Sequence, residues 1–163
     1  MGGNDGLDWD MYGMKIADAA AFKSKDPSTR VGCCILDADQ RVRSTGFNGA
    51  PRGVEFDDGD RDERLLWTIH AEQNAIILAS QDLRGSTLYS TLFPCSACAK
   101  VIIQAGIVRV VAPMDFPTRW ADDFTLSTQM FDQAGVEYED PFYSRGICHH
   151  GERIGDICHS CYE

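Results

Sequence analysis

The chain has 163 residues, of which 44% are hydrophobic, so it can fold as one compact domain rather than remain disordered. Its formal net charge of -10 excludes nucleic acid as the expected partner, although a few local cations could still hold a small anion. No apolar run approaches the roughly eighteen residues of a membrane span, and residues 1–5 lack the features of a signal peptide. We therefore expect a protein without a membrane partner that is cytoplasmic, or in the host cytoplasm if it is viral.

The first half of the chain predicts a helix, a hairpin and a long loop. Methionine and alanine residues recur at helical spacing after Asp8, which is a suitable N-cap. Two strands joined by a turn at residues 37–39 follow, and the next region is rich in Gly, Pro, Asp and Arg. The predicted elements are a helix at 8–23, strands at 31–36 and 42–47, and a loop at 49–64 that can hold a short helix.

The second half predicts strands that alternate with helices. The helices are at 70–80, about 94–106 and 121–133, and the strands are at 87–92, 107–112 and 136–139. This alternation predicts a three-layer α/β/α fold around a mixed sheet of about five strands. We expect this domain to span residues 1–145, followed by an appendage at 146–163 that contains cysteine and histidine.

Three candidate metal ligands stand at the starts of two predicted helices. Cys95 and Cys98 share one helix face, and the aligned N–H groups at a helix start favour their thiolate forms. His70, at the start of the preceding helix, supplies a third ligand. Three protein ligands leave the fourth tetrahedral position of a zinc ion for water, which is typical of a catalytic site. Glu72 can reach that water without binding the metal, so it is the candidate catalytic proton carrier.

Each part of this pattern has an ordinary alternative. A Cys-x-x-Cys pair is also typical of structural zinc knuckles and redox pairs, and a histidine near a glutamate can be a core residue beside a solvated one. The combined order is more specific. His70-Ala71-Glu72, then a strand, then Pro94 before the two cysteines is the known signature of zinc-dependent nucleobase deaminases. The order therefore favours a catalytic site.

Further motifs surround this signature. They are Ser24-Lys25-Asp26-Pro27, Val31-Gly32, Gly46-Phe47-Asn48-Gly49-Ala50-Pro51, Gln73-Asn74-Ala75-Ile76, Leu92-Phe93 and Gln104-Ala105-Gly106-Ile107. With these motifs the chain resembles the deoxycytidylate (dCMP) deaminase family over roughly residues 8–140. The resemblance implies zinc-dependent hydrolysis of dCMP to dUMP, which feeds thymidylate synthesis.

The same resemblance implies partners and further site residues. Asn48 would contact the sugar and base of the substrate, and the backbone of Ala71 would contact the pyrimidine ring. The family also implies a homo-oligomer, commonly a homohexamer, with dCTP as an activator and dTTP as an inhibitor. Effector binding would fall around Phe47, Gly49 and Arg52.

Basic residues near the end of the first predicted helix suit the phosphate of a nucleotide monophosphate. Lys25 and Arg30 stand out in an acidic chain, and Ser24 adds a hydroxyl donor. Lys23, Ser28 and Arg52 add to this group. The alternative is that these charges only solvate the end of the helix.

The remaining cysteines indicate two different roles. Cys33-Cys34 lies in a predicted strand, where cysteine behaves as a small hydrophobic residue and fills the core. The C-terminal cluster predicts a second, structural zinc ion, with the ligands Cys148, His149 or His150, Cys158 and Cys161. The alternative is a flexible tail with free thiols.

Two other functions fit the same residues. The substrate could be dCTP, cytosine, cytidine or a modified dCMP, whereas a polynucleotide is disfavoured because it needs a basic channel. A non-catalytic, zinc-stabilised binding protein is the alternative from another class. Glu72 argues against it, because a structural zinc site needs no carboxylate beside an open ligand position.

Overall fold

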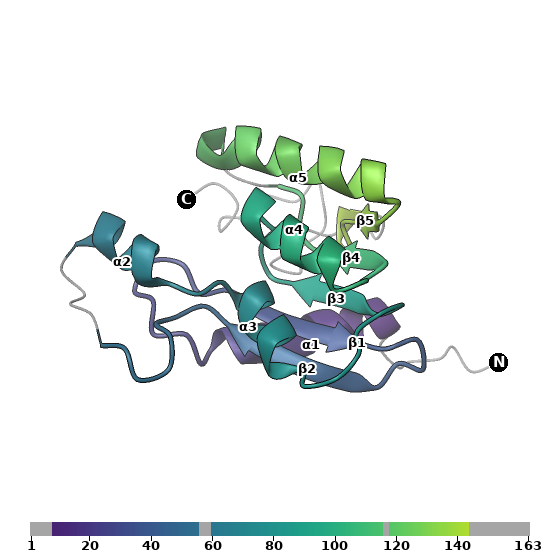
Figure 1. Ribbon diagram of the computed structural model, residues 1–163, viewed down its shortest axis with the longest axis horizontal. Coiled ribbons are helices and arrows are strands. Elements are labelled where there is room, and N and C mark those ends of the chain that lie inside the picture. The colour runs from purple at the N-terminus through teal and green to yellow at the C-terminus, as the bar shows by residue number, and fades with distance from the viewer. Residues whose placement is uncertain (1–7, 56–59, 116–117, 144–163) are drawn as a thin grey trace, which may run out of the picture.

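The computed structural model describes residues 8–55, 60–115 and 118–143, and the predicted second zinc site at 148–161 lies outside these ranges. Five strands form one mixed sheet in the order β2-β1-β3-β4-β5 (Figure 1). They are β1 (Gly32–Leu36), β2 (Val42–Phe47), β3 (Thr87–Ser90), β4 (Arg109–Val111) and β5 (Glu137–Glu139). β1 pairs antiparallel with β2 and β3, whereas β3, β4 and β5 run parallel to one another.

Helices cover both faces of the sheet. They are α1 (Trp9–Ala21), α2 (Arg61–Trp67), α3 (Ala71–Leu78), α4 (Ser96–Gln104) and α5 (Ala121–Ala134), with a 3-10 turn η1 at Thr118–Trp120. α1 packs on one face, and α3, α4 and α5 pack on the other, while α2 projects to one side of the sheet (Figure 1). This arrangement confirms the predicted three-layer α/β/α fold. Within the described ranges, every helix is too short or too polar to span a membrane.

Strand β1, which lies between β2 and β3, shows how the two helix layers are held. Cys33 and Ile35 belong to the core that includes α3, α4 and α5, whereas Cys34 and Leu36 belong to the core beneath α1. All four side chains are fully buried. Successive side chains of a strand point to opposite faces, so β1 contributes equally to both cores. Cys33 and Cys34 are therefore core residues, as predicted.

Two glycines allow helices to approach the β1–β2 hairpin closely. A Cβ atom at Gly32 would overlap the carbonyl oxygen of Ala17 in α1, and a Cβ atom at Gly46 would overlap that of Ala71 in α3. Close packing leaves no room for either addition. Gly46 therefore sets the distance between β2 and α3, the helix that carries Glu72.

Local capping explains where two helices begin and end. The side chain of Asp8 accepts a hydrogen bond from the Met11 N–H at 2.9 Å, as expected of the N-cap of α1. α5 ends at Gly135, whose φ of 70° lies in the left-handed region that glycine adopts readily. Both boundaries follow from signals that are visible in the sequence.

The loop predicted at 49–64 ends earlier than expected, because α2 begins at Arg61 and continues to Trp67. The Asp60 side chain accepts a hydrogen bond from the Asp62 N–H at 2.9 Å and thereby caps the helix start. A short helix was anticipated in this region, but its extent beyond residue 64 was not.

Candidate active site

Two neighbouring helices bring the predicted metal ligands together. His70 is the N-cap of α3, Cys95 is the N-cap of α4, and Cys98 lies in the first turn of α4. The Sγ atoms of Cys95 and Cys98 each lie 3.4 Å from Nδ1 of His70. All three ligand atoms lie within 4.8 Å of one another, and they form a group suited to a metal ion among the described residues.

These distances fit a tetrahedral zinc ion. Bonds of about 2.3 Å to sulfur and about 2.0 Å to nitrogen place the two ligand atoms roughly 3.5 Å apart at tetrahedral angles. The observed separation is 3.4 Å for both sulfurs. Because Nδ1 of His70 faces both sulfurs, it is the ring nitrogen suited to binding the metal. Three protein ligands are typical of catalytic rather than structural zinc.

The two thiols differ in acidity. A hydrogen bond from Cys98 lowers the pKa of Cys95 to about 4, although burial opposes this, and His70 lowers it further. The same hydrogen bond, together with burial, raises the pKa of Cys98. Cys95 is therefore a thiolate at neutral pH. A divalent cation between the sulfurs would favour the thiolate of Cys98 as well.

α4 is capped from another helix. Its N-cap residue, Cys95, has a thiol that faces His70 and makes no capping hydrogen bond. Instead, Asp123 of α5 accepts hydrogen bonds from the Ser96 N–H at 2.9 Å and from the Ser96 hydroxyl at 2.6 Å. Asp123 satisfies an N–H group that the helix start leaves without a partner. It therefore positions the helix that carries both cysteine ligands, a role that no sequence motif indicated.

Two side chains position the start of α3. Oε1 of Gln73 accepts a hydrogen bond from the His70 N–H at 3.4 Å. Nδ2 of Asn74 donates to the carbonyl oxygen of Phe47, at the end of β2, at 3.0 Å. The third ligand is therefore held by its own helix and by the sheet.

Glu72 is a buried acid beside the ligands. It is 4% exposed, and its Oε2 lies 3.6 Å from Sγ of Cys98. Burial raises the pKa of Glu72, and this effect outweighs backbone hydrogen bonding and the charge of His70, which lower it. A carboxyl group with a raised pKa is suited to exchanging protons near neutral pH.

A cavity of about 370 Å³ adjoins these residues, a volume suited to a small ligand. It is lined on the reactive side by His70, Ala71, Glu72 and Cys95. Its apolar lining consists of Val31, Leu65, Leu92, Phe93, Trp120 and Phe124. Its remaining polar lining consists of Asp26, Ser28, Thr29, Asn48, Arg61, Thr68 and Asp123. The cavity therefore combines a mostly apolar wall with a few polar groups.

Asn48 lines the cavity and also joins two loops. Its Oδ1 accepts a hydrogen bond from the Val31 N–H at 2.8 Å, and its Nδ2 donates to the Thr29 carbonyl at 2.9 Å. An amide oxygen can accept a second hydrogen bond, and an amide nitrogen has a second hydrogen to donate. Asn48 can therefore hold the loop and contact a ligand at the same time.

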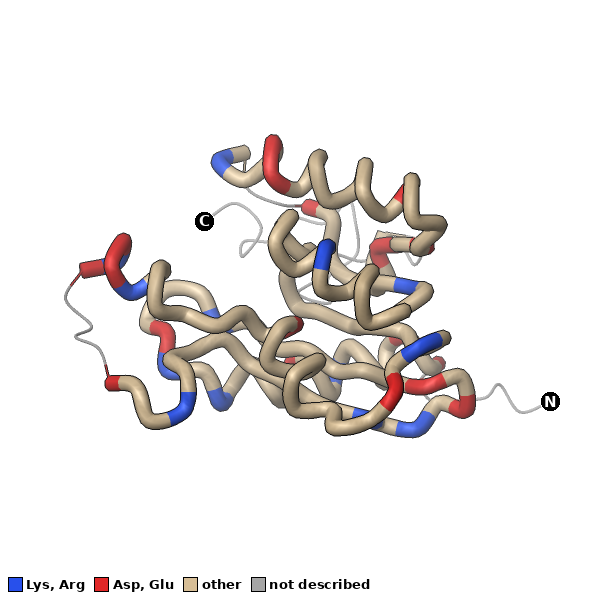
Figure 2. The backbone as a smooth tube through the Cα atoms, in the orientation of Figure 1, with Lys and Arg blue, Asp and Glu red and all other residues tan. Residues whose placement is uncertain are grey.

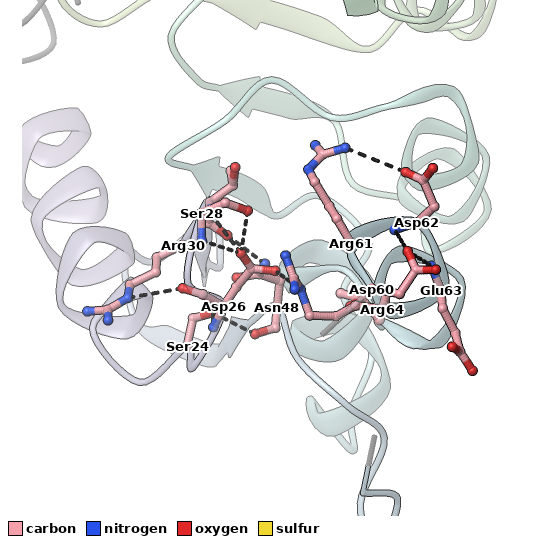
Figure 3. Close-up of polar contacts among 12 residues, drawn as sticks. Ser24, Asp26, Ser28, Arg30, Asn48, Asp60, Arg61, Asp62, Glu63 and Arg64 are labelled. Atoms are coloured by element: carbon pink, nitrogen blue, oxygen red, sulfur yellow. Dashed lines mark hydrogen bonds and ion pairs between the residues drawn. The ribbon is translucent and has the colours of Figure 1, made fainter. Parts of the chain in front are cut away.

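Of the residues predicted to bind phosphate, Ser28 lines the cavity, whereas Lys23, Ser24, Lys25, Arg30 and Arg52 do not. Ser24 is buried, and its hydroxyl donates to the carbonyl of Asn48 at 2.9 Å. Lys25 and Arg30 are exposed. Nε of Arg30 donates to the carbonyl of Asp26 at 3.4 Å, and its guanidinium extends away from the other labelled residues (Figure 3). The structure therefore does not bring Ser24, Lys25 and Arg30 together with the metal ligands.

The predicted effector residues follow the end of β2. Phe47 is the last residue of that strand, and Arg52 is exposed. Gly49 donates to the carbonyl of Ile69 at 3.2 Å and accepts from the Ile69 N–H at 2.9 Å. None of the three lines the cavity. The bridge between Gly49 and Ile69 instead ties this loop to the residue before His70.

A buried ion pair joins α2 to the loop after α1. Nε of Arg64 lies 3.4 Å from Oδ2 of Asp26, and both side chains are 6% exposed. Oδ1 of Asp26 also accepts hydrogen bonds from the Ser28 N–H, the Ser28 hydroxyl and the Thr29 N–H at 2.8–2.9 Å (Figure 3). Burial opposes ionisation, but these hydrogen bonds and Arg64 lower the pKa of Asp26. The ionised carboxylate therefore fixes the turn at Ser28-Thr29 beside α2.

A three-layer domain with one histidine and two cysteine ligands at helix starts, and a buried glutamate beside them, defines a zinc-dependent deaminase. The chain belongs to the cytidine and deoxycytidylate deaminase family, whose zinc-binding region matches residues 7–114.

Relatives with known names match most of the chain. It is 45% identical over 135 residues to an uncharacterized deaminase in the luxG 3′ region of Aliivibrio fischeri, covering 79% of this chain and 90% of that protein. It is 37% identical over 144 residues to deoxycytidylate deaminase of Homo sapiens, covering 83% of this chain and 80% of that protein. The solved dCMP deaminase of cyanophage S-TIM5, in complex with dCMP and dUMP, has a TM-score of 0.66 and 31% identity. That match covers 80% of this chain and 94% of the phage chain.

Proposed function

We propose that this chain hydrolyses dCMP to dUMP and ammonia, with zinc held by His70, Cys95 and Cys98 and with Glu72 as the proton carrier. The observation that carries the proposal is the buried carboxyl of Glu72, which lies beside the three ligands and lines the same cavity. The substrate is supported by the human relative and the phage structure, which are named for dCMP deamination. The product would supply thymidylate synthesis.

Zinc, when bound, would act as a Lewis acid that lowers the pKa of a water molecule. Glu72 takes one proton from the attacking water and delivers it to N3 of the pyrimidine ring. It then takes the second proton of the water and delivers it to the amino group at C4, which leaves as ammonia. The oxygen of the water becomes the carbonyl oxygen of dUMP, so atoms and protons balance.

Other residues of the cavity orient the substrate. We place the sugar and base against the side chain of Asn48, which has spare hydrogen-bonding capacity, and against the backbone of Ala71. Phe93, Trp120 and Phe124 provide apolar walls that exclude water from the reacting atoms. Both features favour a pyrimidine over a large or strongly polar ligand.

Charge disfavours a polynucleotide substrate. The net charge is -10, and Figure 2 shows the positions of Lys and Arg interspersed along the backbone with those of Asp and Glu. A long nucleic acid requires a positively charged groove along its backbone. A single nucleotide requires only one local cation.

The family likeness supports finer proposals. We propose a homohexamer in the cytoplasm, with dCTP and dTTP as effectors that bind around Phe47, Gly49 and Arg52. We also propose a second, structural zinc ion held by the C-terminal cysteines and histidines. Elemental analysis should then find two zinc ions per chain, and one after Cys158 and Cys161 are changed to Ser. One zinc ion in the unmodified protein would contradict the second site.

A substrate panel tests the main proposal. The purified protein is assayed for ammonia release and for the absorbance change with dCMP, CMP, dCTP, deoxycytidine and cytosine, each with and without added dCTP. We expect the highest kcat/KM with dCMP. Protein that contains zinc but deaminates none of these compounds would contradict the proposal, and a preference for dCTP or cytosine would reassign the substrate.

A further inference from the structure

The lining of the cavity contains a single Lys or Arg among the described residues, and it is Arg61. Three carboxylates, those of Asp26, Glu72 and Asp123, line the same cavity. A phosphate monoester brings about 1.5–2 negative charges at neutral pH. Such a ligand would be repelled by the carboxylates unless a cation lay close to it. The charge balance of the cavity therefore points to Arg61.

Arg61 is available to bind a ligand. It is the first residue of α2, and its side chain is 48% exposed. Among the described residues its ion pair is with Asp62 at 3.9 Å, and the Asp62 side chain is 93% exposed. An ion pair this long and this exposed holds a side chain only weakly. The planar guanidinium can therefore turn to bind two phosphate oxygens at once.

The helix that carries Arg61 is held in place by Arg64. Residues three apart lie on the same side of a helix, so the ion pair of Arg64 with Asp26 also orients Arg61. The hydroxyl of Thr68 donates to the carbonyl of Arg64 at 2.8 Å and secures the end of α2. Figure 3 shows Arg64 reaching from α2 toward Asp26, and the Arg61 guanidinium paired with Asp62.

The turn held by Asp26 supplies the other half of the subsite. Ser28 and Thr29 both line the cavity, and the Ser28 hydroxyl already donates to Asp26. The hydroxyl of Thr29 is therefore the better donor to a phosphate oxygen. We propose that Arg61 and Thr29 form the phosphate subsite and make Arg61 the residue that selects a nucleotide over a nucleoside. This inference rests on the proposed function, because it assigns a residue to the phosphate of dCMP.

Two other cations are rivals to Arg61. Arg30 does not line the cavity, and its guanidinium extends away from the other labelled residues (Figure 3). Arg119 also lies outside the lining, although its guanidinium carbon lies 4.4 Å from the ring centre of Trp120, which does line it. Each rival can be tested in the same way as Arg61.

The test compares dCMP with deoxycytidine, which differ by the phosphate alone. Arg61→Ala should lower kcat/KM for dCMP on the order of 30-fold, through KM, because a charge-assisted contact is lost. It should leave kcat/KM for deoxycytidine and the zinc content unchanged, and Arg61→Lys should fall between the two. Arg41→Ala is the matched control, because Arg41 is an exposed arginine of the β1–β2 hairpin.

Equal losses with both substrates would overturn the inference, since they would show a structural effect. A selective loss in Arg30→Ala or Arg119→Ala, without one in Arg61→Ala, would also overturn it. Calorimetric titration with dUMP separates this inference from the proposed function. Weaker dUMP binding by Arg61→Ala than by Arg41→Ala supports the subsite even if turnover of dCMP is absent, and equal binding refutes it.

Discussion

The metal site and the proposed phosphate subsite adjoin the same cavity but are held by different forces. His70 and Cys95 begin helices whose inner residues are buried, as Ala75 in α3 and Ile102 in α4 illustrate. In α2 the buried residue is Arg64, and its neighbours are exposed. The first region therefore rests on hydrophobic packing, whereas the second rests on one ion pair and its hydrogen bonds.

Because of this difference, the residues proposed to carry out the reaction and those proposed to select the substrate belong to regions of different rigidity. Residues that must stay within a few tenths of an ångström of one another lie on helices that cannot move without opening the core. A short helix with few apolar contacts can open locally at a lower free-energy cost. The region around α2 can therefore change, or respond to ligands, without loss of the metal site.

The largest expected effect concerns chemistry alone. Glu72→Ala should lower kcat by about 10³-fold, because the proton carrier is lost, while zinc content and unfolding midpoint are retained. Steady-state kinetics and elemental analysis measure this. Glu63→Ala, at an exposed site in α2, is the control. Equal turnover with and without Glu72 would refute the mechanism.

The next largest effect is expected when the ion pair that holds α2, between Arg64 and Asp26, is removed. Arg64→Met leaves the buried Asp26 carboxylate without its cation and should lower the free energy of unfolding by about 3 kcal/mol. KM for dCMP should rise, while zinc stays bound. Urea unfolding and kinetics measure both.

The double variant Asp26→Asn/Arg64→Met serves as its control, because it should recover part of the lost stability. Loss of zinc in Arg64→Met would show that the two regions are not independent.

A smaller effect sharpens the description of the metal region. Asp123→Ala removes the cap of α4 and should weaken zinc binding about 10-fold, as loss of outer positioning residues commonly does. Competition with a chelator measures the affinity. The adjacent, exposed Asp122→Ala should leave it unchanged. Equal zinc affinity in the two variants would rule out the positioning role.

The smallest effect concerns the opposite face of the sheet, distant from both regions. Asp10 of α1 accepts hydrogen bonds from Arg109 at 2.7 and 2.9 Å and from the Tyr89 hydroxyl at 3.1 Å. The hydrogen bond from Arg109 lowers the pKa of Asp10, although burial opposes it. The lowered pKa adds stability that is present above the unfolded value of about 3.9 and is lost as the pH falls through the folded value.

Asp10→Asn should therefore cost about 1 kcal/mol at pH 7, and the difference from the unmodified protein should shrink below about pH 4. Urea unfolding of both proteins across pH 3–7 measures this, and kcat/KM at pH 7 should not change. A stability difference that is the same at every pH would contradict the role of the ionised carboxylate.

Much of the fold and of the metal site could be predicted because the signals are local. Helical spacing and the cap at Asp8 gave the start of α1, and the spacing of Cys95 and Cys98 placed both thiols near one helix start. The predicted phosphate group shows where local signals stop. Ser24 stands beside Lys25 in the sequence, yet one side chain is buried and the other is exposed. Which of them faces a cavity depends on how distant segments pack.

The sequence by itself determined the chemistry, because three ligands and a carboxylate occur at short spacings that only certain reactions need. It also determined the order in which strands and helices follow one another along the chain, since hydrophobic periodicity and caps act over a few residues. Only the tertiary structure decided which residues support that chemistry. Asp123 caps the ligand helix, and Arg61 is the one Lys or Arg among the described residues that line the cavity. Both follow from packing, which brings α5 and α2 beside segments from which they are distant in the chain.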